Sequence, residues 1–508
     1  MIKAILAAIC GALAVFAFAP FDYWITAFIA YCGLLYCVAS SASLKQAFAM
    51  GLCWGVGFFG AGVHWVYISI QQFGELPPVI AFILLALLIV YLSLYPAIFA
   101  ALLRKSSRPY SFIQFVIAAP ALWQITEFLR GYILTGFAWL QLGYTQLDGP
   151  LNGYLPVFGV ASLNLIIPVI SGLLLYIYYS IKNRAPKWQP VTAFLTILLL
   201  TGSALLLRQV NWVKVDEDRS LNFALIQGNI EQSLKWDPKR LTQTLQDYQR
   251  LTEQNLDSAN IIIWPEAAIT DLEINQQSYL KNIDTQARLM DTAVLVGLID
   301  LQFSRSANRI FNSLVVLGDE QPYQYPTTNR YNKYHLVPFG EFIPLSWLLS
   351  PIADLLNIPM SSMSSGEYIQ APLKIKGYTF VTAICYEIIL SQQIWDNFTP
   401  ETDFLLTVSN DAWFGNSIGP WQHLQMARTR AVEFGRPLIR STNNGITTIV
   451  DHHGQIQKQL PQFEQQVLTA QVSPTIGFTP YIKWGNKPFW GITLSLLLIM
   501  LFWRKREH

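Results

Sequence analysis

Three residues combine types and positions that could carry out covalent chemistry: Glu266, Lys333 and Cys385. Glu266 follows the apolar run 261–264 and a proline, which cannot extend a sheet ladder, so this acid is predicted at the end of a strand. Cys385 ends a β-rich run and precedes a helical stretch, a turn at which a nucleophile is exposed beside backbone N–H groups. Lys333 lies in a loop punctuated by Gly and Pro that also carries Glu341.

Grouping these residues gives a workable reaction centre. A thiol with its usual pKa of about 8.5 is mostly protonated at neutral pH. A carboxylate could take that proton, and a lysine could stabilise the thiolate and a tetrahedral oxyanion. Each residue also has a plainer interpretation: Glu266 as an exposed loop acid, Lys333 as a solvated lysine and Cys385 as a buried inert thiol. His335, close to the lysine, is more readily structural than catalytic.

The cysteines are distributed unevenly. Four of the five lie in apolar stretches, and Cys385 is the one in the polar part of the chain. A lone thiol there cannot form a disulfide within its domain, and it is either a buried small residue or a reactive group. No Cys/His spacing resembles a zinc site, so neither a metal nor a cofactor is expected.

Strands that end at these residues must belong to a layered domain. Between residues 214 and 480, β-rich runs alternate with helical stretches, which is the pattern of an α/β layered fold long enough for its own core. The predicted strands are 222–227, 260–264, 293–298, 313–317, 378–384, 403–408, 437–441 and 447–451, and the predicted helices are 237–258, 276–290, 387–397 and 421–434.

The remainder of the chain is apolar. Charged residues make up only 13% of the sequence, about half of what a soluble protein carries. A helix needs roughly 20 mainly apolar residues to cross a bilayer. We therefore predict a bundle of seven helices in 1–213, a polar domain in 214–480, and an eighth span with a basic tail in 481–508. The apolar stretches are 2–19, 23–41, 46–70, 78–103, 111–130, 158–181, 190–207 and 488–503, the fifth being weakened by Pro120 and Glu127.

Loop charge indicates an orientation. Basic residues gather at both termini and in alternate loops, whereas the opposite short loops hold Asp22, Glu75 and Asp148, with Arg130 as their basic residue. This bias predicts cytoplasmic termini, and seven spans then deliver the polar domain to the other side of the membrane. The alternative is a cytoplasmic domain with one span miscounted. A net charge of +2 predicts no nucleic-acid partner.

Glu266, Lys333 and Cys385, with their flanking residues and in this order along the chain, resemble the Glu-Lys-Cys triad of the nitrilase (carbon–nitrogen hydrolase) superfamily. The resemblance covers about residues 220–475. The apolar helices narrow the resemblance to the apolipoprotein N-acyltransferase family of the bacterial inner membrane. It implies a membrane α-helical bundle of about eight helices plus a periplasmic α/β nitrilase-like αββα sandwich. Supporting strings lie at 227–230, 233–236, 335–341, 409–415 and 136–144, the last with Ala138 where the family usually has Pro.

The resemblance implies a ping-pong acyl transfer. Cys385 attacks an ester of a membrane phospholipid, typically phosphatidylethanolamine, and forms a thioester. The free amine of an S-diacylglyceryl cysteine on an apolipoprotein then takes the acyl chain. In this scheme Glu266 is the general base, and Lys333 stabilises the oxyanion together with the Tyr386 backbone N–H. Glu341 resembles a second glutamate that orients Lys333.

Lipid substrates also require a route to the site. Trp236, Tyr386 and Glu387 match family positions near the substrate entrance, which implies binding or gating roles. Pulling an acyl chain into water costs about 0.8 kcal/mol per CH₂, so the site must open at the bilayer surface. We therefore predict that the apolar runs within 345–360 form a membrane-dipping lid, with a flexible arm at 361–366. Ordinary core packing is the alternative for these runs.

Two other functions compete with acyl transfer. A membrane-tethered amidase or nitrilase would use the same triad with water as the acceptor, although a tether needs one span and not eight. A transporter or sensor would use the polar domain only to bind a ligand. Few ionisable residues lie within the predicted spans, Glu127 being the main one, whereas pumps usually need more.

Overall fold

The computed structural model describes residues 1–74, 76–303, 308–343 and 363–507, and the lid predicted at 345–360 lies outside them. The chain divides into two compact units. The helical unit consists of Met1–Tyr67, Pro77–Trp212 and Thr479–His508. The α/β unit consists of Ile68–Leu76 and Val213–Phe478.

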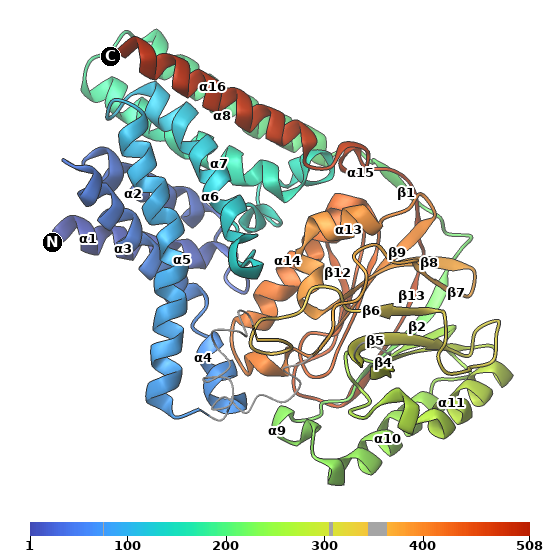
Figure 1. The fold of residues 1–508 in the computed structure, drawn as a ribbon. Helices are drawn as coiled ribbons and strands as arrows, with labels where there is room; N and C mark the ends of the chain where they lie inside the picture. The colour runs from blue at the N-terminus through green and yellow to red at the C-terminus, as the bar shows by residue number, and fades with distance from the viewer. Residues whose placement is uncertain (75, 304–307, 344–362, 508) are drawn as a thin grey trace. The chain divides into compact units, whose positions relative to one another are not determined.

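Every apolar stretch identified in the sequence contains a helix (Figure 1). Several of these helices are shorter than the apolar stretches because turns or π-helical segments, such as η3 (Ile113–Ala118), interrupt them. The main helices are α1 (Ile2–Ala14), α2 (Ile25–Ala39), α3 (Leu44–Gly62), α5 (Pro78–Ser106), α6 (Ala119–Arg130), α7 (Leu155–Lys182), α8 (Trp188–Arg208) and α16 (Lys487–Glu507).

Helix length reduces the number of candidate membrane spans. Four helices in the described part of the chain are long and apolar enough to cross a bilayer, or five if the bent pair Leu44–Gly62 and Val66–Gln72 counts as one span. Helix α1 has 13 residues and is therefore about 20 Å long, less than the hydrocarbon thickness of about 30 Å. The chain thus has several apolar helices suited to a membrane, and the predicted eight exceed those that meet the length requirement.

Glycines allow the helices of this unit to pack closely. A Cβ on Gly11 of α1 would lie 1.9 Å from the carbonyl oxygen of Trp54 in α3. A Cβ on Gly51 of α3 would lie 2.2 Å from the carbonyl oxygen of Pro96 in α5. Close packing of this kind, in which a glycine lets two helix backbones approach each other, holds apolar helices together where no hydrophobic driving force acts between them.

A buried ion pair accounts for the acid in the fifth stretch. Glu127 Oε2 lies 2.6 Å from Arg130 Nη2 on the next turn of α6. Arg130 also donates to the carbonyl oxygens of Phe137 and Trp139, at 2.5 and 2.6 Å. Arg130 is 1% exposed, so it anchors the loop after α6 instead of contributing a free surface charge.

The α/β unit contains two six-stranded sheets. In each sheet the central strands are parallel and the outer ones antiparallel. The first sheet has the order β13 (Gln466–Val472), β2 (Leu221–Gln227), β3 (Ile261–Ile263), β4 (Ala293–Gln302), β5 (Arg309–Leu317), β6 (Arg330–Asn332), and the second β12 (Ile456–Gln459), β11 (Thr448–Val450), β10 (Leu438–Thr442), β9 (Thr402–Ser409), β8 (Tyr378–Ile384), β7 (Leu373–Ile375).

The two sheets face each other and are covered by helices on their outer faces (Figure 1). Helices α10 (Pro238–Glu253) and α11 (Gln277–Leu289) pack on the first sheet, and α13 (Ser391–Asn397) and α14 (Gly419–Phe434) on the second. Apolar residues of both sheets form one buried core between them. The layers are therefore helix, sheet, sheet, helix, the αββα sandwich that the resemblance implied.

One helix prediction for this unit is wrong. The stretch 387–397 is not a single helix, because a 3₁₀ turn, η8 (Cys385–Ile389), precedes α13. Leu390 separates them with φ −87° and ψ 80°, outside the helical region. The Glu387 side chain accepts a hydrogen bond from the Ile384 backbone N–H, which favours a tight turn directly after β8.

A short segment from the first half of the sequence belongs to the α/β unit. Ile68–Leu76 includes η2 (Ser69–Phe73), which contacts η9 (Asp411–Phe414). The Ser69 hydroxyl donates to the Trp413 carbonyl oxygen at 2.6 Å. This segment therefore supports the loop that follows strand β9.

Candidate active site

Cys385 lies where strand β8 turns into the 3₁₀ segment η8. Its φ of +55° is in the left-handed region, which costs a residue other than glycine about 1 kcal/mol or more. Its side chain is partly buried against the core between the sheets. A strained turn of this kind sets the thiol apart from the strand and ends the regular ladder at the predicted nucleophile.

Glu266 lies three residues after strand β3 and is 6% exposed. Its Oε1 accepts hydrogen bonds from Asn312 Nδ2 at 2.8 Å and from Lys333 Nζ at 3.2 Å. Its Oε2 accepts from the Asn410 backbone N–H at 2.8 Å. Donors from three separate parts of the α/β unit therefore fix this carboxylate in one orientation.

Lys333 directly follows strand β6 and is 1% exposed. Its ammonium lies between two carboxylates, 2.9 Å from Glu341 and 3.2 Å from Glu266. Glu341 also accepts from the Val337 backbone N–H at 2.9 Å, which folds its loop back onto the lysine. Asn312 Nδ2 connects the two acids, since it donates to Glu341 at 3.1 Å as well as to Glu266.

The charges of this cluster act on Cys385. Burial raises the pKa of the Cys385 thiol well above its usual range, and Glu266 adds to the rise while Lys333 opposes it. Burial would also raise the pKa of Glu266, but Lys333 and Lys235 outweigh it and lower that pKa. Burial would lower the pKa of Lys333, but Glu266 and Glu341 raise it well above its usual value. At neutral pH the cluster therefore contains a thiol, a carboxylate and an ammonium.

Glu387 is fully buried. It accepts five hydrogen bonds, three of them from backbone N–H groups on both sides of the site. One N–H belongs to Ile384, before the nucleophile, and two belong to Tyr334 and His335, after the lysine. Glu387 therefore connects the turn at Cys385 to the loop that carries Lys333.

The other predicted entrance residues pack around the site. The Tyr386 ring stacks on the His335 ring, with centroids 5.4 Å apart and an interplanar angle of 18°. Trp236 is half-buried and packs on an apolar cluster that includes Ala267 and Leu336, each close in sequence to a predicted catalytic residue. Burial lowers the pKa of His335 to about 4, so its ring is neutral.

The described end of the predicted flexible arm is bonded to the site. The backbone N–H of Met363 donates to the Glu341 carbonyl oxygen at 2.9 Å, and that of Gly366 donates to the Lys333 carbonyl oxygen at 2.8 Å. Met363 is buried. Residues 363–366 therefore brace the loop that carries Lys333 and Glu341.

Several residues that hold the site were not found from the sequence. Asn312 is within strand β5, directly before the predicted β-rich run 313–317, and it bridges the acids. Lys235 donates to the Glu266 carbonyl oxygen at 3.0 Å, and burial lowers its pKa to about 8. Lys235 and Asn410 were both within family-like strings, but only the fold shows that they donate hydrogen bonds to Glu266.

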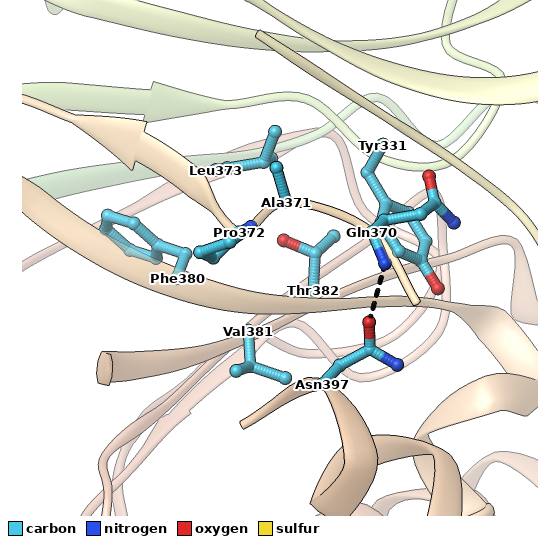
Figure 2. A pocket seen from close by; sticks show the side chains of 9 residues that line it. All are labelled: Tyr331, Gln370, Ala371, Pro372, Leu373, Phe380, Val381, Thr382 and Asn397. Atoms are coloured by element: carbon cyan, nitrogen blue, oxygen red, sulfur yellow. Dashed lines mark hydrogen bonds between the residues drawn. The ribbon is translucent and has the colours of Figure 1, made fainter. Parts of the chain in front are cut away.

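Two hollows lie elsewhere in the α/β unit. A cavity of about 10 Å³ beside Tyr331 has room for one water molecule, and Figure 2 shows Gln370 donating to Asn397 at its rim. A hollow of about 490 Å³ near Lys374 is lined largely by polar residues. None of the predicted catalytic residues lines either of them. Among the described residues, no group of three or more His, Cys, Asp or Glu could hold a metal ion.

Comparisons with known proteins agree with this architecture. The carbon–nitrogen hydrolase family model matches residues 222–481, which defines the α/β unit as a carbon–nitrogen hydrolase domain. The model of the apolipoprotein N-acyltransferase N-terminal domain matches residues 10–173. The chain belongs to the apolipoprotein N-acyltransferase family.

Full-length relatives support that assignment. A protein of Vibrio cholerae named apolipoprotein N-acyltransferase is 44% identical over 100% of this chain and 98% of its own length. One of the same name from Photobacterium profundum is 44% identical over 98% of this chain and 95% of its own length. The similarity therefore extends through the helices as well as the carbon–nitrogen hydrolase domain.

Proposed function

We propose that this chain is an enzyme that transfers a fatty acyl chain from a membrane phospholipid to the N-terminal amine of a lipoprotein, through a thioester on Cys385. The observation that carries the proposal is the 44% identity over the whole chain to a protein named apolipoprotein N-acyltransferase. The cluster of Glu266 and Lys333 beside Cys385 supplies the groups that such chemistry needs.

In the first half-reaction, the Cys385 sulfur attacks the ester carbonyl of the phospholipid while Glu266 accepts the thiol proton. A C–S bond forms, and negative charge develops on the carbonyl oxygen. We assign stabilisation of that oxyanion to the Lys333 ammonium and the Tyr386 backbone N–H. The C–O bond then breaks, and the proton on Glu266 passes to the departing lysophospholipid oxygen.

In the second half-reaction, the amine of the S-diacylglyceryl cysteine attacks the thioester. Glu266 takes a proton from this amine. The C–S bond breaks to give the amide, and the proton on Glu266 passes to the departing sulfur, which restores the thiol and the carboxylate. Glu266 begins and ends each half-reaction as a carboxylate and Lys333 stays an ammonium, because the pKa of Glu266 is lowered and that of Lys333 raised. The same pair can therefore serve both half-reactions.

The remaining predicted residues take supporting roles. Glu341 positions Lys333, to which it is bonded at 2.9 Å. Glu387 positions the two loops that it connects, and its burial argues against the binding or gating role inferred from the sequence. Trp236 packs against the cluster behind Glu266 and Lys333 and retains a proposed role in binding the acyl chain.

The apolar helices support a membrane protein whose substrates are a phospholipid donor and a lipoprotein acceptor. We propose phosphatidylethanolamine as the donor and the bacterial inner membrane as the location. The basic residues at both termini support cytoplasmic ends, a bundle within 1–213, a periplasmic domain within 214–480 and a final span within 481–508. Full assembly into eight spans requires the shorter helices to cross as well.

Mass spectrometry of the protein purified from membranes tests the function. We expect a fatty-acyl mass on the peptide that carries Cys385, absent from Cys385→Ser and discharged by a synthetic diacylglyceryl peptide with a free amine. If the thioester discharges to water at the same rate with and without that peptide, the chain is a hydrolase. If Cys385→Ala retains full biological activity, the enzymatic proposal fails.

A further inference from the structure

The backbone carbonyl of Cys385 has a buried side-chain partner. His423 on α14 lies with its Nε2 3.2 Å from the Cys385 carbonyl oxygen. A carbonyl oxygen can only accept, so Nε2 must carry a proton and donate it. This contact links the nucleophile turn to a helix on the outer face of the second sheet.

His423 is held in turn by two buried charged residues. Its Nδ1 lies 3.0 Å from Asp411 Oδ1 and 3.1 Å from Arg440 Nη2. Arg440 also donates to Asp411 Oδ2 at 2.6 Å, and the side chains of all three residues are 0% exposed. A ring fixed at both nitrogens cannot rotate, so Nε2 remains directed at the Cys385 carbonyl.

The same loop supports the general base. Asn410, directly before Asp411, donates its backbone N–H to Glu266 Oε2 at 2.8 Å. Loop 410–411 thus fixes Glu266 through one residue and His423 through the next. The base and the backbone of the nucleophile are thereby tied to a common support.

Peptide geometry gives the histidine contact a function. The C=O of Cys385 and the N–H of Tyr386 belong to one planar trans unit, so they point in opposite directions. The hydrogen bond from His423 holds the Cys385 carbonyl while the φ of Cys385 is +55°. The direction of the Tyr386 N–H is therefore fixed as well. A hydrogen bond to the carbonyl also polarises the unit and strengthens its N–H as a donor.

We propose that His423 is a positioning residue that directs the Tyr386 backbone N–H toward the oxyanion formed at Cys385. The inference rests on the proposed function, because it assumes that Cys385 attacks a carbonyl carbon. Burial and the charge of Arg440 lower the pKa of His423, whereas Asp411 and the Cys385 carbonyl raise it. The contact with the Cys385 carbonyl requires a proton on Nε2 in either charge state of the ring. Asp411 keeps Arg440 in place.

The test compares two reactions of the same thiol in the full-length protein. A short p-nitrophenyl ester acylates Cys385 through a tetrahedral oxyanion, whereas iodoacetamide alkylates it by displacement without one. The variants are His423→Phe, which removes the donor, and His423→Gln, which retains an N–H. His453→Phe is the matched control, since His453 is an exposed histidine on a turn.

We expect His423→Phe to slow acylation by about 100-fold, as the loss of an oxyanion donor does, while alkylation changes by less than about threefold. His423→Gln should recover much of the acylation rate, and His453→Phe should leave both rates unchanged. Thermal unfolding checks each variant, and if His423→Phe does not fold, His423→Leu, which also lacks an N–H, takes its place in the comparison of the two rates. Equal losses in acylation and alkylation, or no loss in either, would overturn the proposal.

The design separates this proposal from the proposed function. The p-nitrophenyl ester reports on the oxyanion site whether or not phospholipid is the natural donor. If wild-type protein reacts with the ester but never carries a lipid-derived acyl group, the proposed function fails while the role of His423 is still measured. Cys385→Ala gives the background rate for both reagents.

Discussion

Glu266 must remain ionised in a buried site if it is to accept the proton of Cys385. Replacing it with Gln keeps its size but removes its basicity. We expect Glu266→Gln to slow acylation by a p-nitrophenyl ester by about 10²–10⁴-fold, the usual contribution of a general base. Stopped-flow release of p-nitrophenolate measures this rate. Glu253→Gln, at an exposed acid, is the control, and an acylation rate within threefold of wild type in Glu266→Gln would rule out the base role.

Lys235 offers a second test of the same carboxylate. The pKa of Glu266 is lowered against burial by Lys333 and Lys235, so the carboxylate form is present above this lowered pKa and is lost as pH falls through it. Lys235→Met removes one of the two charges and raises the pKa of Glu266. The acid limb of the pH–rate profile should therefore move to higher pH. A profile of acylation rate against pH checks this, and Lys239→Met, in an exposed position, should leave it unmoved.

At this scale the sequence indicated the residues that we propose react more readily than the residues that support them. Glu266 and Cys385 follow apolar runs, a pattern that strand ends leave in a sequence. Asn312 could not be recognised, because a polar residue inside a strand usually indicates a solvent-facing side. Here the side-chain amide of Asn312 in strand β5 is buried and donates to Glu266 and Glu341, which are distant in sequence. Only the pairing of strands brings these groups together.

At the scale of elements, Glu387 joins the turn after β8 to the loop after β6. Both Glu387 carboxylate oxygens now accept hydrogen bonds. In a carboxamide, an NH₂ group would face some of these donors and could not accept from them. We expect Glu387→Gln to lower the free energy of unfolding by about 2–3 kcal/mol, because a buried donor loses its partner. Thermal unfolding in detergent measures the shift, with the exposed Glu401→Gln as the control. An unchanged midpoint would show that the connection contributes no stability.

The elements themselves were unevenly predictable. Strand β8 matched its predicted bounds, since its β-rich run is flanked by a glycine turn and by the break at Cys385. The edge strands β6 and β7 have only three residues each, too short for an alternating pattern to be recognised. The prediction of a single helix over 387–397 was wrong because the Glu387 side chain, and not the spacing of apolar residues, determines the local turn.

At the scale of the whole molecule, the α/β unit is not a continuous piece of the sequence. Ser69 belongs to this unit and donates to Trp413 in the loop that also carries Asn410 and Asp411. We expect Ser69→Ala to lose about 1 kcal/mol of local stability, so that amides in 410–415 exchange roughly fivefold faster. Hydrogen–deuterium exchange with mass spectrometry measures this, and Ser258→Ala is the matched exposed control. Unchanged exchange would mean that the segment does not support the loop.

The sequence predicted two environments in one chain, and the chain divides into a helical unit and an α/β unit. Eight spans were predicted and four or five helices of the described chain meet the length requirement, because apolar composition does not show where a helix is interrupted. The placement of Ile68–Leu76 was not foreseen either, since a short loop between two apolar stretches carries no pattern that assigns it to the polar domain.

During biosynthesis, the segment Ile68–Leu76 is made well before the loop that it supports. Ser69 and Trp413 are 344 residues apart, which a ribosome adding about 5–20 residues per second covers in roughly 20–70 s. For this interval the segment has been made while the loop that it supports has not. The domain that holds Cys385 thus receives one of its parts long before the rest. A fragment that begins at Val213 lacks that part from the start.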